Sequence, residues 1–212
     1  MAKETLTLKI RKNTLSTRHK LAKIIAPRLI ETLSKTTEDN PENTRPMISF
    51  LHEDYFGNKP LIGCEIGTRE GINALRIIET LNIKKLYLID PYTPYYDPLV
   101  PESSTIAYHE KTFSQAQQLL SKHASKIIWL KLTSDEAAYH IKDQLDFCYI
   151  DGDHSYQQVK KDITNYSELL TKDGVIGGHD FTKEYLGTMK AVLEQPNWQN
   201  VKSSVHDWWL IK

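Results

Sequence analysis

The chain has 212 residues, enough for one domain with an added segment and a substantial buried core. Lysine plus arginine and aspartate plus glutamate balance at 27 each, which argues against nucleic acid as the partner. The two cysteines, Cys64 and Cys148, lie in apolar runs and are expected to be buried thiols. No apolar run approaches the roughly twenty residues of a membrane span, which predicts a cytoplasmic protein.

The first thirty residues are basic. A pattern of apolar residues from Ser16 predicts an amphipathic helix, kinked at Pro27, that packs beside the sheet, covers the cofactor cleft or forms a homodimer contact. Residues 36–48 are polar and are predicted to be a linker, and a short helix is expected within 47–56. These features assign residues 1–58 to an N-terminal helical extension and residues 59–212 to the main domain.

A short apolar strand runs through a glycine turn into a helix with apolar residues at three-residue steps from Ile72. The turn reads Glu65-x-Gly67-x-x-x-Gly71, which differs from the Gly-x-Gly-x-x-Gly fingerprint of dinucleotide binding. Gly67 would let the backbone approach a ligand, and Gly71 would let the helix pack closely on the strand. A ligand with an ammonium near Glu65 and a carboxylate at the helix N-terminus fits this turn, as the methionine part of S-adenosylmethionine would. The same turn also occurs as a purely structural feature of α/β proteins.

The second apolar run ends in Asp90, about twenty residues beyond the glycine turn, where a doubly wound fold places a carboxylate on a ribose diol. Residues 91–105 contain four prolines and three tyrosines and are predicted to form a loop over the carboxyl edge of the sheet. The elements expected next are a helix at 110–122, with Phe113, Ala116, Leu119 and Leu120 inward, a strand at 127–130 and a short helix capped by Thr133 or Ser134.

Two further strands are each followed directly by carboxylates and an imidazole. The first, 145–150, precedes Asp151, Asp153 and His154, and the second, 175–178, precedes His179 and Asp180. A helix closed by a turn at 172–174 connects them. The carboxyl ends of parallel strands meet at one edge of the sheet, where ligands bind in open α/β folds. A lone aspartate or histidine would more often be a cap or a surface residue, but two paired sets indicate chemistry.

A helix at 183–194 is followed by two short strands, 201–204 and 208–211. Their short link favours antiparallel pairing, because a parallel crossover needs about a dozen residues. Strands that alternate with helices along the rest of the chain predict a parallel, doubly wound sheet. The expected fold is therefore α/β, with a mostly parallel sheet that ends in an antiparallel hairpin.

Over residues 60–212 the sequence resembles the class I S-adenosylmethionine-dependent methyltransferases, and most closely the group called methyltransferase type 24, related to O-methyltransferases of sugars and macrolides. The resemblance lies in YIDGDHSY at 149–156 and GVIGGHD at 174–180, with support from the glycine turn and Asp90. It implies a Rossmann-like, seven-stranded sheet in the order 3-2-1-4-5-7-6, with strand seven antiparallel. It also implies S-adenosylmethionine as the cofactor, bound by Glu65, Gly67, Thr68, Gly71, Asp90 and Asp151, with Thr133 and Ser134 flanking the adenine.

The resemblance implies methyl transfer to a hydroxyl of a small-molecule or sugar acceptor, with Asp151 closest to the sulfonium and the nucleophile. His154 or His179 could remove the hydroxyl proton as general base. Alternatively, Mg²⁺ or another divalent cation held by Asp151, Asp180 and Asp153 would lower the pKa of the hydroxyl and orient it. The sequence leaves both alternatives open.

Two residues depart from the family pattern. Phe181 stands where relatives of the catechol type carry a second ligand, and Thr133 stands where many relatives have aspartate. Three other functions remain as alternatives: an NAD(P)-dependent oxidoreductase, a non-catalytic module that keeps the fold, and a nucleic-acid methyltransferase that uses the basic N-terminus. The missing dinucleotide fingerprint argues against the oxidoreductase. The acids and histidines at the strand ends argue against a non-catalytic module, and the net neutrality argues against a nucleic-acid methyltransferase.

Overall fold

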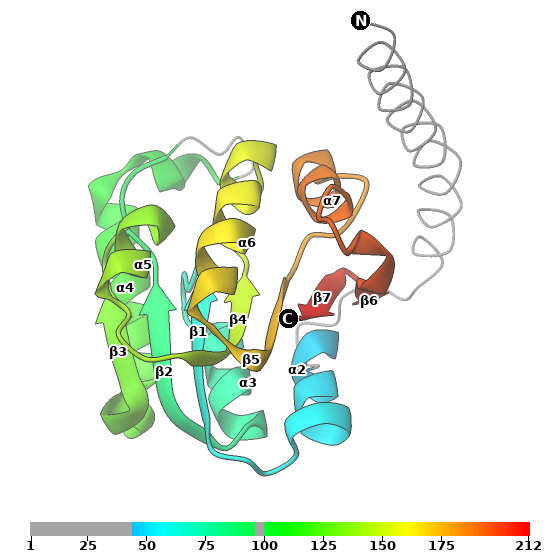
Figure 1. Ribbon diagram of the computed structural model, residues 1–212. Helices are drawn as coiled ribbons and strands as arrows, with labels where there is room; N and C mark the ends of the chain where they lie inside the picture. Colours follow the sequence, from blue (N-terminus) through cyan, green and yellow to red (C-terminus); the bar gives the residue numbers. More distant parts are fainter. Residues whose placement is uncertain (1–43, 96–99) are drawn as a thin grey trace, which may run out of the picture. The chain divides into compact units, whose positions relative to one another are not determined.

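Seven strands form a single mixed sheet (Figure 1): β1 (Leu61–Ile66), β2 (Ile83–Ile89), β3 (Ile127–Leu130), β4 (Leu145–Ile150), β5 (Leu170–Gly178), β6 (Lys202–Ser204) and β7 (Asp207–Ile211). The computed structural model describes residues 44–95 and 100–212. The strand order is β3-β2-β1-β4-β5-β7-β6. β1 to β5 pair in parallel, and β7 runs antiparallel to β5 and β6. The predicted Rossmann-like sheet is confirmed.

Helices cover both faces of this sheet (Figure 1). In one layer α2 (Pro46–Phe50) contacts α3 (Ile72–Thr80), which contacts α4 (Ile106–Leu119). In the other layer α6 (Tyr156–Leu169) contacts both α5 (Ser134–His140) and α7 (Leu186–Leu193). The remaining helical elements within residues 44–95 and 100–212 are a π-helix, Leu51–Phe56, and three 3₁₀ helices, Pro101–Ser104, Ser121–Lys126 and Trp198–Asn200.

The central strand, β4, buries all six of its residues. The ring of Phe147 on β4 occupies the space beside Gly63 on β1, where a Cβ on the glycine would overlap it. The register pairs Gly63 with Phe147 and Ile66 with Ile150. Because the packing at the centre favours this register, β1 and β4 end level with each other. The residues that follow the two strands therefore lie at the same height on the carboxyl edge.

The helix predicted at 110–122 begins earlier, at Ile106. Its N-cap is Thr105, whose side-chain oxygen accepts the backbone N–H of Tyr108 and so satisfies a donor that the first turn leaves open. At the other end Leu119 is 40% exposed, whereas Leu120 is buried as predicted. The predicted inward position of Leu119 was therefore wrong, because the helix turns that residue toward solvent before the chain re-enters the core at Leu120.

Three other boundaries differ from the prediction. β5 begins directly after α6, so the predicted turn at 172–174 lies within the strand. The loop predicted at 91–105 contains the 3₁₀ helix Pro101–Ser104. The last helix, α7, begins at Leu186 rather than at 183. The hairpin prediction is confirmed, since β6 pairs antiparallel with β7.

The segment before β1 packs on the sheet. α2 and the π-helix confirm the helix expected within 47–56. The linker predicted at 36–48 was wrong at its end, because Pro46 already begins α2, and Met47, Ile48 and Leu51 are fully buried. Residues 44–58 belong to the same compact unit as the sheet. The amphipathic helix expected from Ser16 lies outside the described residues. Among the residues that are described, no helix has the length and apolarity to cross a membrane.

Candidate active site

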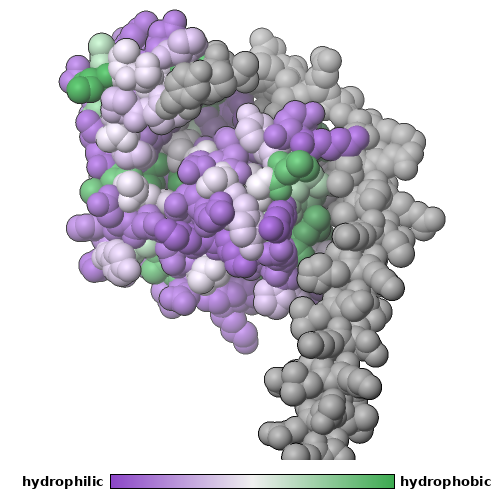
Figure 2. Space-filling model, turned by 90° about the horizontal axis from the view of Figure 1, so that it is seen from above, coloured by the Kyte–Doolittle hydropathy of each residue, from purple (hydrophilic) through white to green (hydrophobic). Residues whose placement is uncertain are grey.

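Hydrogen bonds continue the parallel ladder just beyond the strands at the carboxyl edge. The backbone N–H of Gly67 donates to the carbonyl of Ile89 at 2.8 Å, that of Asp151 donates to Ile66 at 2.8 Å, and that of His179 donates to Ile150 at 3.0 Å. These bonds fix the residues that follow β1, β4 and β5. The parallel strands point upward in Figure 1, so Figure 2 looks onto this edge, where the coloured surface is mostly hydrophilic with separate hydrophobic patches.

The two glycines of the turn after β1 both have positive φ angles, +85° at Gly67 and +81° at Gly71, which favour glycine. A Cβ on Gly67 would overlap the backbone carbonyl of Asp151. A Cβ on Gly71 would lie 3.1 Å from Leu120 and 3.4 Å from Ala116. Gly67 is therefore needed for contact with the end of β4, and Gly71 for packing against α4 rather than against β1 as the sequence suggested.

Glu65 is a buried carboxyl group at the end of β1, with only 1% of its surface exposed. Its Oε1 accepts a hydrogen bond from Asn73 Nδ2 at 2.8 Å. Its Oε2 and the hydroxyl of the neighbouring Thr68 are buried and have no hydrogen-bond partner among the described residues. Burial raises the pKa of Glu65 to about 8. A buried carboxyl oxygen without a partner fits a cationic ligand, as the ammonium of S-adenosylmethionine requires.

Asp90, at the end of β2, holds the loop around it through both carboxylate oxygens. Oδ2 accepts the backbone N–H of Arg69 at 2.9 Å, and Oδ1 accepts that of Tyr92 at 2.8 Å. The Tyr92 hydroxyl donates to the carbonyl of Arg69 at 2.9 Å. Each oxygen retains a second lone pair that could accept a ribose hydroxyl. Burial raises the pKa of Asp90.

Thr133 and Ser134 were predicted to flank adenine, but their hydroxyls form hydrogen bonds with other groups of the protein. Thr133 is the N-cap of α5, in a capping box with Glu136. The Ser134 hydroxyl donates to Asp162 Oδ1 at 2.7 Å and accepts from Gln158 at 3.0 Å. These contacts orient both side chains toward α5 and α6. The prediction that the two residues flank adenine stays a prediction, without side-chain geometry to support it.

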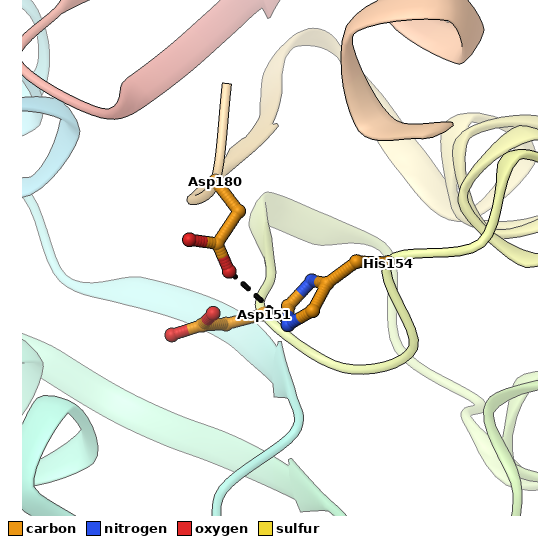
Figure 3. A group of neighbouring side chains, drawn as sticks. All are labelled: Asp151, His154 and Asp180. Atoms are coloured by element: carbon orange, nitrogen blue, oxygen red, sulfur yellow. Dashed lines mark ion pairs between the residues drawn. The ribbon is translucent and has the colours of Figure 1, made fainter. Parts of the chain in front are cut away.

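Asp180 connects the two candidate histidines. Its Oδ2 lies 3.1 Å from His154 Nε2, and its Oδ1 lies 3.0 Å from His179 Nδ1. Figure 3 shows the His154 ring pointing from the loop after β4 toward the Asp180 carboxylate, with Asp151 beside them. The backbone of Asp180 has a φ of +58°, which is uncommon outside glycine. A strained backbone at a charged cluster is typical of functional sites.

Asp151 lies next to this pair and is largely buried. One of its oxygens is 4.0 Å from His179 Nδ1, and the other is 4.0 Å from the Nη2 atom of Arg45. Burial raises the pKa of Asp151. Burial alone would lower the pKa of His179, but the hydrogen bond to Asp180 and the charge of Asp151 raise it. Burial alone would raise the pKa of Asp180, but its bond to His179 and the nearby cations lower it.

Three side chains in the described part of the chain could share a metal ion: Asp151, His154 and Asp180. Each offers one ligand atom, and these atoms lie within 4.8 Å of one another. Asp153, which the sequence suggested as a third ligand, is exposed and instead accepts the backbone N–H of Ser155 at 2.7 Å. The structure therefore brings His154 to the position that the sequence had assigned to Asp153.

Sequence reasoning missed three residues that surround this cluster. Arg45 falls in a segment predicted to be linker. Tyr185 packs edge-on against His154, with ring centroids 4.5 Å apart. Asp207 is fully buried and accepts hydrogen bonds from the Met47 N–H at 3.0 Å and the Tyr149 hydroxyl at 2.8 Å. None of the three carries a sequence signal, because each contact joins segments far apart in the chain.

The edge thus has two parts, a buried cofactor-type turn over β1 and β2 and a cluster of acids and histidines over β4 and β5. This combination on this sheet fits the class of S-adenosylmethionine-dependent methyltransferases. The chain belongs to the methyltransferase domain family, which it matches over residues 64–181, more than half of its length. Membership of this family argues against the oxidoreductase alternative.

Proteins that are similar to the chain include one protein sequence and two solved structures. The chain is 32% identical over 131 residues to an uncharacterized protein of Acanthamoeba polyphaga mimivirus; the match covers 59% of this chain and about half, 54%, of that relative. A candidate caffeoyl-CoA O-methyltransferase from Staphylococcus aureus has the same fold, with a TM-score of 0.56, 15% identity and coverage of 96% of this chain and 99% of that one. A candidate methyltransferase from Streptococcus mutans, in complex with S-adenosylhomocysteine (SAH), has a TM-score of 0.57 and 11% identity over 80% of this chain and 99% of its own.

Proposed function

We propose that the chain transfers the methyl group of S-adenosylmethionine to a hydroxyl oxygen of a small polar acceptor, such as a sugar or a phenol. The observation that carries the proposal is Asp180, whose two oxygens lie 3.1 Å from His154 and 3.0 Å from His179. An alcohol or phenol must lose its proton when it attacks the methyl group. A histidine oriented by a carboxylate is suited to remove that proton. The hydrophilic surface in Figure 2 suits a polar acceptor.

The residues over β1 and β2 fit S-adenosylmethionine, which supplies an already activated methyl group. The partnerless oxygen of Glu65 would meet the ammonium. The backbone N–H groups at the start of α3 would meet the carboxylate, and Asp90 would accept the ribose hydroxyls. Asp151 lies between the glycine turn after β1 and the histidines, because its backbone contacts Gly67 while its side chain faces His179. Holding two reactants in line can supply roughly 7–11 kcal/mol of the barrier.

In one version of the mechanism His154 is the general base. Its Nε2–H would donate to Asp180, so the other ring nitrogen, Nδ1, would take the acceptor proton, while Asp180 orients the ring and stabilises the imidazolium that forms. Tyr185 packs on the ring from the side and limits its rotation. General base catalysis of this kind contributes roughly 10²–10⁴-fold.

In the second version Asp151, His154 and Asp180 would hold a divalent cation, which would lower the pKa of the acceptor hydroxyl. The ligand atoms of these three residues lie within 4.8 Å of one another, so one ion could contact all three. One imidazole with two carboxylates suits Mn²⁺, Fe²⁺ or Zn²⁺ better than Mg²⁺. The nitrogen that binds a cation cannot also accept a proton, so in this version His154 is a ligand and His179 remains as the base.

The test uses S-adenosylmethionine with an isotope-labelled methyl group and a panel of sugars and phenols. We expect the label on an oxygen of the product, identified by NMR, and label on nitrogen or carbon would contradict the proposal. Treatment with EDTA then separates the two versions. Unchanged turnover supports a histidine base without a cation, whereas loss of turnover that Mn²⁺ or Zn²⁺ restores supports the cation.

A further inference from the structure

The segment that precedes β1 is anchored to the sheet next to the active site. The N–H of Met47 donates to Asp207 Oδ2 at 3.0 Å. Its side chain fills space that Gly177 leaves on β5, where a Cβ would lie 2.5 Å from the Met47 sulfur. Met47 and Ile48 are fully buried. The backbone that follows Pro46 is therefore held by β5 and β7, although in sequence it lies far from both.

This anchoring directs Arg45 into the acid and histidine cluster. Its Nη2 atom lies 4.0 Å from Asp151 Oδ2, and both side chains are only 20% exposed. Its charge acts on Asp151, His179 and Asp180 together. Because an arginine side chain in a protein keeps its proton, Arg45 is a permanent cation, unlike the two histidines.

Arg45 lies on the side of Asp151 that faces away from the cofactor turn. The turn and Asp90 follow β1 and β2, whereas Asp180 follows β5 and the anchor Asp207 begins β7. In-line transfer requires the acceptor on the side of the methyl group opposite to the sulfur. With the donor over β1 and β2, the acceptor must enter over β4 and β5. Arg45 therefore borders the space of the acceptor.

We propose that Arg45 recognises a carboxylate or phosphate group of the acceptor, so that this methyltransferase acts on an acidic hydroxyl compound. The guanidinium presents a planar fork of N–H donors that matches both groups in a bidentate manner. Without a cation at this place, Asp151 and Asp180 would repel an anionic acceptor. The inference rests on the proposed hydroxyl methylation, and it adds the class of acceptor.

The test measures binding by calorimetry to the full chain saturated with SAH. The probes are two matched pairs, gallate with methyl gallate and glycerophosphate with glycerol, which report on carboxylate and phosphate separately. We expect at least one acid to bind about tenfold or more tightly than its neutral partner. In Arg45→Met this preference should disappear, with a loss of roughly 10- to 100-fold for the acid and little change for the neutral probe. The preference of Arg45→Lys for the acid should fall between that of the wild type and that of Arg45→Met.

The matched control is Arg76→Met, which removes a guanidinium from α3 and should keep the preference. The melting temperature of each SAH-loaded variant shows whether it is folded. If neither acid binds more tightly than its neutral partner, or if Arg45→Met weakens both members of a pair equally, the inference is wrong and Arg45 only offsets the charge of Asp151. Failure of the wild-type chain to bind SAH would instead overturn the proposed function and the inference with it.

Discussion

His154 Nε2 lies 3.1 Å from Asp180 Oδ2, so the carboxylate at the end of β5 fixes the ring that follows β4. In Asp180→Asn an NH₂ group replaces one of the two carboxylate oxygens that now face His154 and His179. We expect the turnover rate, measured with labelled S-adenosylmethionine, to fall roughly 10²- to 10⁴-fold, with unchanged affinity for SAH. The control Asp135→Asn changes a surface carboxylate paired with Lys161. Turnover by Asp180→Asn close to that of the control would show that the contact has no catalytic role.

Binding of SAH should release a proton from Glu65. Burial raises the pKa of this carboxyl group to about 8, so it is mostly protonated in the free protein near neutral pH. A bound ammonium favours the charged carboxylate, which lowers that pKa and releases close to one proton at about pH 7. Calorimetry in buffers of different ionisation enthalpy measures the release.

Glu65→Gln should abolish this proton release. Its affinity for SAH should fall further behind that of the wild type as the pH rises from about 7 to 9, since the wild-type carboxyl group ionises more readily there. If no proton is released and the gap in affinity does not change with pH, the ammonium does not bind at Glu65.

Gly67→Ala should damage the site by steric overlap. The added methyl group would meet the carbonyl of Asp151 at a backbone φ of +85°. We expect the free energy of unfolding to fall by about 1–3 kcal/mol and SAH binding to weaken, because the ends of β1 and β4 must separate. Gly57→Ala is the control, since Gly57 also has positive φ but has no atom within 4 Å of the new methyl group. Equal affinities of the two variants for SAH would contradict the assigned contact.

Asp207 should make the stability depend on pH. Burial raises its pKa from 3.8 to about 6, although Met47 and Tyr149 both donate to it. The folded chain therefore binds the proton more tightly than the unfolded chain, and stability is lost as the pH rises from about 4 to above 6. That pKa difference corresponds to roughly 3 kcal/mol.

Asp207→Asn lacks this titration, so its free energy of unfolding relative to the wild type should increase by up to roughly 3 kcal/mol between about pH 4 and 7. Chemical denaturation at several pH values measures the difference. Asp143→Asn is the control, because hydrogen bonds from Lys85 and Tyr87 lower the pKa of Asp143 and give the opposite sign. A difference that stays constant with pH would contradict the assignment for Asp207.

The carboxyl-edge residues of the site could be predicted because each follows an apolar run. Glu65, Asp90 and Asp151 come at or just after the ends of strands, and parallel strands end at one edge. The hairpin at the end of the chain followed from the short link between its strands. Local patterns of this kind depend only on neighbouring residues, which the sequence displays directly.

The contacts that complete the site depend on long-range packing. Arg45 reaches the cluster because Met47 bonds to Asp207, a residue 160 positions away. Whether Asp153 or His154 joins Asp151 and Asp180 depends on the loop after Gly152, where the Asp153 side chain accepts the backbone N–H of Ser155. Neither the distant bond nor the side-chain direction leaves a periodic pattern in the sequence.

We expect methyl transfer to take place beside Asp151. The most direct measurement is the single-turnover rate of Asp151→Ala at saturating S-adenosylmethionine, with SAH affinity and melting temperature as checks on the fold. The account predicts a folded protein that still binds SAH and transfers methyl groups at least roughly 10²-fold more slowly. A folded variant that transfers methyl groups at the wild-type rate would contradict it.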